Sequence, residues 1–242
     1  EIGAGFTGTF PSAALSYQFY VVNGFKGYDE GATLSGGNGF RKGRQKGAES
    51  IIHSPNLTFK INYFGLPGLQ LGFSGYTGST QSSLYDDLDK SDEFLLAQAD
   101  SSIVGFSMLG VDARYALGGL GLRGQANLGV VSNSARYNEF TGSDLGRTIG
   151  GWYLEVSYNL LHGIERYESE LIPFVRFEQY STHLSTEDPL IQNPDYQRSD
   201  LTIGLGWKIA AGAMFKTDFQ WFADKGTGDT RNQFNAGVAV WF

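Results

Sequence analysis

Four basic residues cluster in a glycine-rich stretch of the N-terminal quarter of the chain. They are Arg41, Lys42, Arg44 and Lys46, within a segment spanning residues 24–52. Cations on a loop that folds into a narrow, poorly screened space would attract an anion, as charged side chains do in channels. An ordinary solvated surface loop is the alternative, and the residues alone leave both open. The choice depends on the elements that hold this loop.

The surrounding elements are predicted to be β-strands, because apolar and polar residues alternate with a period of two. In residues 201–209 (LTIGLGWKI), Leu201 and Trp207 fall on one face and Lys208 on the other. The same alternation occurs in ten further segments: 2–10, 13–23, 57–64, 69–77, 105–117, 121–131, 151–161, 171–180, 213–222 and 232–242. The sequence therefore predicts an all-β fold with about eleven strands in a single domain, residues 1–242.

Composition narrows the function classes. The 34 glycines and 14% aromatic residues favour strands with tight turns. A net charge of −7 argues against a nucleic-acid partner, and the absence of cysteine removes disulfides, thiol nucleophiles and cysteine-based metal sites. There is no apolar run long enough for a transmembrane helix, whereas a mean hydropathy of −0.22 is compatible with a membrane barrel, whose apolar residues are diluted by alternation.

The connections between the strands separate a membrane barrel from a soluble sandwich. Very short connections (66–68, 118–119 and 211–212) alternate with long polar ones (24–52, 79–101, 132–147, 183–197 and 224–231). Many large aromatic residues lie on the apolar face, often near strand ends, where an interfacial girdle would lie. This rhythm predicts a transmembrane antiparallel β-barrel, with a soluble sandwich as the alternative.

In such a barrel, the charged residues in mid-strand would line the lumen. The candidate cations of the wall are Lys60, Arg114, Arg123, Arg176, Lys208 and Lys216, and the acids that oppose them are Asp112, Glu155, Glu178, Asp200 and Asp218. Because the two sets nearly cancel, we expect many of these charges to pair with one another. The wall itself should then be only weakly selective.

Other motifs have simpler explanations. Residues 119–124 (GLGLRG) match a dinucleotide fingerprint but lie at a turn between two strands with no following helix. The acidic stretch 85–93 lacks the spacing of a calcium loop, and residues 94–99 are expected to form a short helix. The three histidines, His53, His162 and His183, are far apart in the sequence. We therefore predict neither a catalytic nor a metal site, and no cofactor.

Several stretches resemble the phosphate-selective porin family of bacterial outer-membrane barrels. They are residues 39–51 (GFRKGRQKGAESI), 54–78, 110–129, 170–180 (ELIPFVRFEQY) and the terminal GVAVWF. The resemblance implies a sixteen-stranded barrel, commonly a homotrimer, with a basic loop folded into the pore. It also implies contact with the lipid bilayer and lipopolysaccharide, and the terminal Phe242 resembles part of the signal read by the barrel-assembly machinery.

The strand count departs from this family, since eleven is odd and bacterial single-chain barrels normally have an even number. Either the count is wrong by one, or the chain is the C-terminal part of a larger barrel that lacks its N-terminal strands here, which we favour. The expected function is passive diffusion of small hydrophilic solutes, with a preference for anions such as phosphate, and not catalysis. The alternative is a structural barrel that acts as a subunit or anchor of a cell-envelope assembly.

Overall fold

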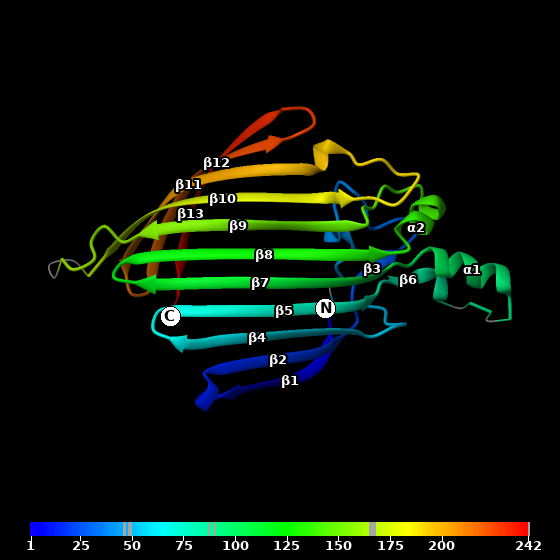
Figure 1. Ribbon diagram of the computed structural model, residues 1–242, viewed down its shortest axis with the longest axis horizontal. Coiled ribbons are helices and arrows are strands. Elements are labelled where there is room, and N and C mark those ends of the chain that lie inside the picture. Colours follow the sequence, from blue (N-terminus) through cyan, green and yellow to red (C-terminus); the bar gives the residue numbers. More distant parts are fainter. Residues whose placement is uncertain (46, 48–49, 87, 90, 165–167, 242) are drawn as a thin grey trace.

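The computed structural model describes residues 1–45, 47, 50–86, 88–89, 91–164 and 168–241. Eleven strands form one antiparallel sheet in which strands adjacent in the sequence are adjacent in space (Figure 1). Their order across the sheet is β1 (Gly3–Phe10), β2 (Leu15–Val22), β4 (Asn56–Leu66), β5 (Leu69–Ser79), β7 (Gly105–Leu117), β8 (Leu120–Ser132), β9 (Thr148–Tyr158), β10 (Glu170–Ser185), β11 (Gln197–Ala210), β12 (Ala213–Asp224) and β13 (Thr230–Val240). Within these residues, no helix is long and apolar enough to cross a membrane.

The prediction of an all-β fold with about eleven strands is confirmed. Each segment with period-two alternation forms a strand, and the ends differ by a few residues. The largest difference is at β10, which continues to Ser185, so the connection expected at 183–197 is shorter than predicted. The sheet curls, and β12 and β13 turn away from the plane of β5–β9 (Figure 1).

The β4–β5, β7–β8 and β11–β12 turns lie at one end of the sheet, and the β2–β4, β5–β7, β8–β9 and β10–β11 connections lie at the other (Figure 1). The β9–β10 connection departs from this pattern, because residues 159–164, which begin it, lie at the end with the short turns. The β7–β8 turn consists of Gly118 and Gly119, whose φ values of 57° and 80° lie in the left-handed region that favours glycine. The long connections contain the remaining elements: β3 (Lys26–Tyr28) paired in parallel with β6 (Gln81–Ser82), the helices α1 (Glu93–Ser101) and α2 (Ser134–Thr141), and the 3-10 turns η2 (Arg41–Gly43), η3 (Ser83–Tyr85) and η4 (Pro194–Tyr196). A further 3-10 turn, η1 (Pro11–Ala13), joins β1 to β2.

The two α-helices differ in how far the sequence predicted them. The helix expected at 94–99 is confirmed as α1, and Asp92 caps it by accepting from the backbone N–H groups of Phe94 and Leu95. The long polar connection predicted at 132–147 also contains a helix, α2, which the sequence analysis did not predict. Its N-cap residue, Asn133, makes no side-chain capping bond, so the local start signal is missing.

Buried apolar residues gather at the end of the sheet that carries the long connections. The cluster consists of Leu34, Val104, Val131, Tyr137 and Leu145, all at most 1% exposed. These residues come from four separate parts of the chain: the β2–β4 connection, the residue before β7, β8, and the β8–β9 connection. The long connections therefore fold together into a small core rather than extending freely from the sheet.

Candidate functional site

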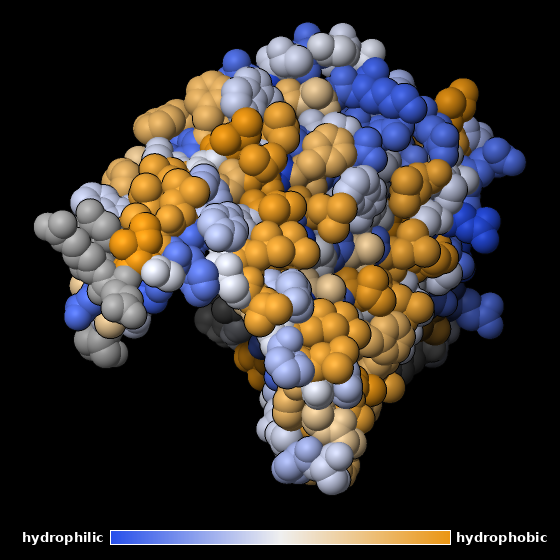
Figure 2. Space-filling view, turned by 60° about the vertical axis from the view of Figure 1, so that its left-hand side comes forward, coloured by the Kyte–Doolittle hydropathy of each residue, from blue (hydrophilic) through white to orange (hydrophobic). Residues whose placement is uncertain are grey.

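The strand register places the side chains of the eleven strands on two chemically different faces. One face, which we call the outer face, is dominated by apolar residues such as Leu154 (59% exposed) and Val238 (72% exposed). Figure 2 shows apolar side chains spread over the sheet in this view. The opposite face is called the inner face, because residues 24–52 pack against it. All charged residues within the described parts of these eleven strands stand at inner-face positions of the register.

Most of the charged inner-face residues form ion pairs. The pairs that include predicted wall cations are Lys60–Asp112 (2.7 Å), Arg123–Glu155 (3.8 Å), Arg176–Glu178 (2.6 Å) and Lys208–Glu170 (2.5 Å). A further pair, Arg198–Asp224 (3.1 Å), lies at the end with the long connections. The expected pairing of wall charges is thus present at four of the six predicted cations.

The other two predicted wall cations have different surroundings. Arg114 is exposed, is the direct cross-strand neighbour of Arg123, and has no ion pair among the described residues. Lys216 lies over the ring of Phe174, with Nζ 4.4 Å from the ring centroid. Of the predicted acids, Asp218 accepts a hydrogen bond from Asn235 (2.8 Å) and Asp200 faces Glu178 across the register.

The β2–β4 connection folds over the inner face and is held there by aromatic packing. The ring of Phe40 lies 5.4 Å from that of Phe25 and 5.4 Å from that of Phe106 on β7, and it also packs with Ile149 on β9 against the buried core. Because Phe106 and Ile149 are inner-face residues, the connection crosses the inside of the curled sheet. That this loop lies within a pore stays a prediction.

Two side chains from other connections fix the course of this loop. Tyr137 of α2, fully buried, donates from its hydroxyl to the carbonyl of Gly27 (2.6 Å) and accepts from the N–H of Leu34 (3.3 Å). Burial raises the pKa of Tyr137, so the hydroxyl keeps its proton. Asp144 accepts from the N–H of Gly36 (2.8 Å) and from the hydroxyl of Tyr196 (2.6 Å).

The helix that carries Tyr137 is capped by a residue far away in the sequence. Glu187, which follows β10, accepts hydrogen bonds from the hydroxyl of Ser134 (2.8 Å) and the N–H of Ala135 (2.9 Å) at the N-terminus of α2. Burial opposes the charge of Glu187, but these two donors, with Arg147 3.8 Å away, outweigh it and lower its pKa. A carboxylate at this position also favours the helix through the helix dipole.

The predicted anion-contact residues lie in and just after η2. Arg41, Lys42 and Arg44 are exposed, and Arg41 and Arg44 flank a hollow of about 440 Å³ whose apolar wall consists of Phe25 and Phe40. Lys46 and the expected assembly signal, Phe242, lie outside the described residues. Anion contact by the first three residues stays a prediction.

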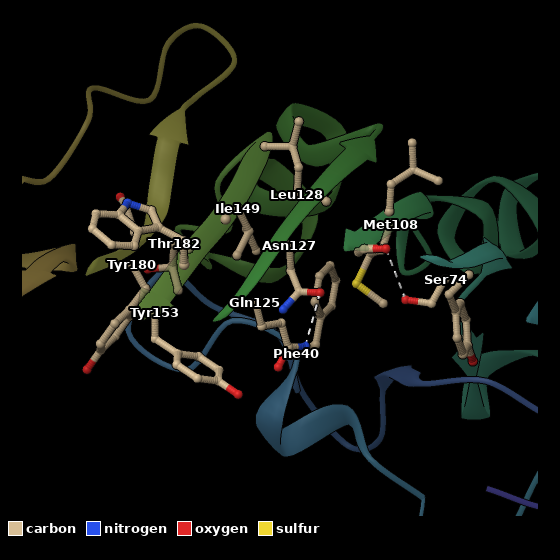
Figure 3. A pocket seen from close by; sticks show the side chains of 18 of the residues that line it. Phe40, Ser74, Met108, Gln125, Asn127, Leu128, Ile149, Tyr153, Tyr180 and Thr182 are labelled. Atoms are coloured by element: carbon tan, nitrogen blue, oxygen red, sulfur yellow. Dashed lines mark hydrogen bonds between the residues drawn. The ribbon is translucent and has the colours of Figure 1, made fainter. Parts of the chain in front are cut away.

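A larger cavity, of about 630 Å³, lies between Phe40 and the strands of the inner face. Its inner-face lining includes Gln125 and Asn127 of β8, Tyr153 of β9 and Tyr180 of β10. In Figure 3 these four side chains point toward the side of Phe40, whereas Leu128 points to the opposite side of the sheet. A volume of this size is in the range of about 300–1,000 Å³ found for ligand pockets.

The sequence analysis missed these lining residues because they are uncharged. It singled out cations on the inner face, whereas Gln125, Asn127, Tyr153 and Tyr180 occupy the same register positions without a charge. Their alternation with Ala126, Leu128, Trp152 and Leu154 was the available signal, since it places them on the charged face of the sheet. The cavity itself also needs Phe40, whose position no local pattern indicates.

The other motifs have structural roles. In the acidic stretch, Asp89 accepts from Ser91 and Asp92 caps α1; the residues numbered 87 and 90 lie outside the described part. Residues 119–124 form the end of a turn and the start of a strand, so the helix that a dinucleotide fingerprint needs is missing there. His183 bonds to the carbonyl of Asp144 (2.6 Å) and packs edge-on against Tyr196. In the described part of the chain, no group of three or more His, Asp or Glu residues is arranged to hold a metal ion.

The chain is only distantly similar to known proteins. No family model matches the chain. An uncharacterised protein of Aquifex aeolicus (strain VF5) is 25% identical over 206 residues, which are 85% of this chain and 45% of that protein. The chain therefore spans less than half the length of this relative. Among solved structures, LpxR from Salmonella typhimurium matches over 98% of this chain and 87% of its own, with a TM-score of 0.36 and 10% identity.

Proposed function

We propose that this chain is part of a transmembrane β-barrel of the bacterial outer membrane that lets small hydrophilic solutes diffuse through its interior. The observation that carries the proposal is the sorting of charge. Within the described residues of eleven strands, every charged side chain is on the inner face. A charged side chain facing hydrocarbon costs about 2–4 kcal/mol at the bilayer midplane, whereas a face in water has no reason to exclude charge so completely.

The dimensions of the outer face fit this proposal. On β11 the outward apolar residues run from Leu201 to Ile209, about 26 Å along the strand and about 20 Å after a tilt of about 40°. This height is close to the apolar band of about 25 Å in outer-membrane barrels. Aromatic residues lie near the ends of some outward faces at the side of the short turns, as Tyr158 does on β9 and Trp207 on β11. Such positions match the interfacial girdles of these proteins.

The two edge strands of the sheet, β1 and β13, determine how many further strands an antiparallel barrel would need in order to close. Strand order ends at β1 and β13, and among the described strands neither has a partner on its outer edge. In an antiparallel sheet of eleven strands the first and the last run in the same direction, so antiparallel closure needs an odd number of additional strands. Five would give the sixteen of the phosphate-selective porins that the sequence resembles. We propose that further strands of a longer protein complete the barrel, because an open edge in lipid leaves backbone groups unpaired.

We propose that the anion preference of the pore comes from the β2–β4 connection. Wall charges are largely paired, whereas Arg41, Lys42 and Arg44 are exposed on a connection that crosses the inner face. Unpaired cations in a confined interior raise the local concentration of anions. The proposed selectivity therefore comes from η2 and its flank rather than from the wall.

Planar-bilayer recording of the full-length protein tests the proposal. We expect a stable open pore whose reversal potential in a salt gradient shows anion preference. The double variant R41A/R44A should move the reversal potential toward the cation side. The matched control R136A/K225A, which removes two exposed cations from the β8–β9 and β12–β13 connections, should not. An open pore unaffected by R41A/R44A would refute the role of the loop. Absence of conductance in a correctly folded barrel would favour the structural subunit or anchor instead.

A further inference from the structure

The cavity beneath Phe40 differs chemically from the rest of the inner face. Glu178 is the charged residue among its described lining, and its carboxylate is engaged by Arg176 at 2.6 Å. The remaining described lining combines hydroxyls, amides and aromatic rings with glycines and four aliphatic or thioether side chains, those of Met108, Leu109, Leu128 and Ile149. A solute in this cavity would therefore meet hydrogen-bonding groups and ring faces rather than an uncompensated charge.

Two amides on β8 present a donor and an acceptor side by side. Gln125 Nε2 donates to Asn127 Oδ1 over a long 3.4 Å bond, and both residues are exposed (Figure 3). This arrangement leaves Gln125 Oε1 as an acceptor and Asn127 Nδ2 as a donor, with no partner for either among the described residues. Because a hydroxyl both donates and accepts, two adjacent hydroxyls on one ligand would match this pair.

An aromatic platform lies beside these amides. Tyr153 is the direct cross-strand neighbour of Gln125, and the guanidinium of Arg176 lies over its ring, 3.8 Å from the centroid. Arg176 is itself held by Glu178, so one face of the Tyr153 ring is covered and the ring is fixed in place. A ligand would stack on the opposite face. Tyr180, one register row away, points to the same side in Figure 3.

The geometry points to a binding subsite for neutral polyhydroxylated solutes, of the chemical class of oligosaccharides. The C–H face of a sugar ring would stack on Tyr153 while adjacent hydroxyls bond to Gln125 and Asn127. The inference rests on the proposed function, since it places the subsite in the interior through which solutes would pass. It adds a neutral ligand class to a path for which the proposed function gives only an anion preference.

The test uses the full-length protein in planar bilayers, with maltotetraose as the probe. We expect concentration-dependent interruptions of the current, and none with polyethylene glycol of similar size. Tyr153→Leu and the double variant Q125L/N127L should each weaken the interruption by about tenfold, because each removes one of the two recognition elements. Tyr153→Phe keeps the ring and should retain most of the effect. Tyr20→Leu, which changes an inner-face tyrosine of β2 outside the cavity, is the matched control and should leave it unchanged.

The outcomes separate this inference from the proposed function. If the unmodified protein forms an open pore that maltotetraose does not interrupt, or that polyethylene glycol interrupts equally, the subsite is overturned while the pore stands. The same holds if Tyr20→Leu weakens the interruption as much as Tyr153→Leu does. If no pore forms, the proposed function fails first. Normal single-channel conductance of each variant shows that it has folded.

Discussion

Replacing Leu154 by arginine distinguishes lipid from water at the outer face. Leu154 is 59% exposed, lies near the middle of β9 between Trp152 and Tyr158, and belongs to the outward apolar row. If the face is in hydrocarbon near the midplane, Leu154→Arg should destabilise the folded protein in the bilayer by about 2–4 kcal/mol. That corresponds to a roughly 30- to 900-fold change in the folding equilibrium.

The same substitution has a different effect if the face is in water. An exposed leucine in a soluble sheet loses few packing contacts on replacement, and surface changes of this kind usually stay within about 0.5 kcal/mol. The loss of folding stability expected for Leu154→Arg is therefore several-fold larger if the outer face is in lipid than if it is in water. Gln220→Arg is the control, because Gln220 is an inner-face residue of β12 and an added charge there stays hydrated.

Reversible folding into lipid vesicles along a urea series measures both variants of the full-length protein, with tryptophan fluorescence as the signal. A stability of Leu154→Arg within about 0.5 kcal/mol of the unmodified protein would refute the assignment of the outer face to lipid. So would a folded, monodisperse protein in the absence of detergent and lipid, whatever the variants show.

Three further predictions concern the long connections. Glu187→Gln should destabilise α2 by about 1 kcal/mol at pH 7, seen as faster amide exchange in α2, while the exposed Glu139→Gln should not. Because the pKa of Glu187 is lowered from its ordinary 4.5, its contribution is fully present above that value and is lost as the pH falls through the lower folded value, so the variants should converge in acid. Tyr137→Phe leaves the buried N–H of Leu34 unpaired and removes one of the two hydrogen bonds to the carbonyl of Gly27, which keeps the N–H of Thr33. The change should cost about 1–3 kcal/mol, measured by protease cleavage within residues 24–52. Asp144→Ala frees the same segment at Gly36 and should increase current noise in the open pore.

The strands were predictable because their signal is local. Alternation with period two, interrupted by turns such as Gly118–Gly119, fixes both the existence of a strand and the face of each side chain. The helix α1 was also predictable, since Asp92 provides its own start signal. By contrast, α2 depends on Glu187, which lies 53 residues from Ser134, and no pattern near α2 contains that information.

The site was predictable only in part for the same reason. Which face holds Lys60 or Arg176 follows from alternation, and their pairing follows from near-equal numbers of acids and bases on that face. The cavity does not follow, since it requires Phe40 to lie over β7–β9. That position depends on contacts such as Tyr137 with Gly27, 110 residues apart. The cations of η2 could be predicted as candidate site residues because they are charged, whereas the Gln125–Asn127 pair is uncharged and carries no comparable sequence signal.

The two faces of the sheet require two different surroundings, and this constrains any alternative to the membrane. The inner-face ion pairs are partly exposed, as in Lys60–Asp112 with side chains 36% and 18% exposed, and such pairs persist where water reaches them. Within the described residues of the eleven strands, the outer face carries no charged side chain. A second protein layer would need a polar rim where it ends, and no such rim of charges occurs on the described outer face. The small core of Leu34, Val104 and Tyr137 closes only one end of the sheet. Under the proposed function we therefore expect the outer face to be covered from outside the described chain, by a continuous apolar solvent that needs no rim.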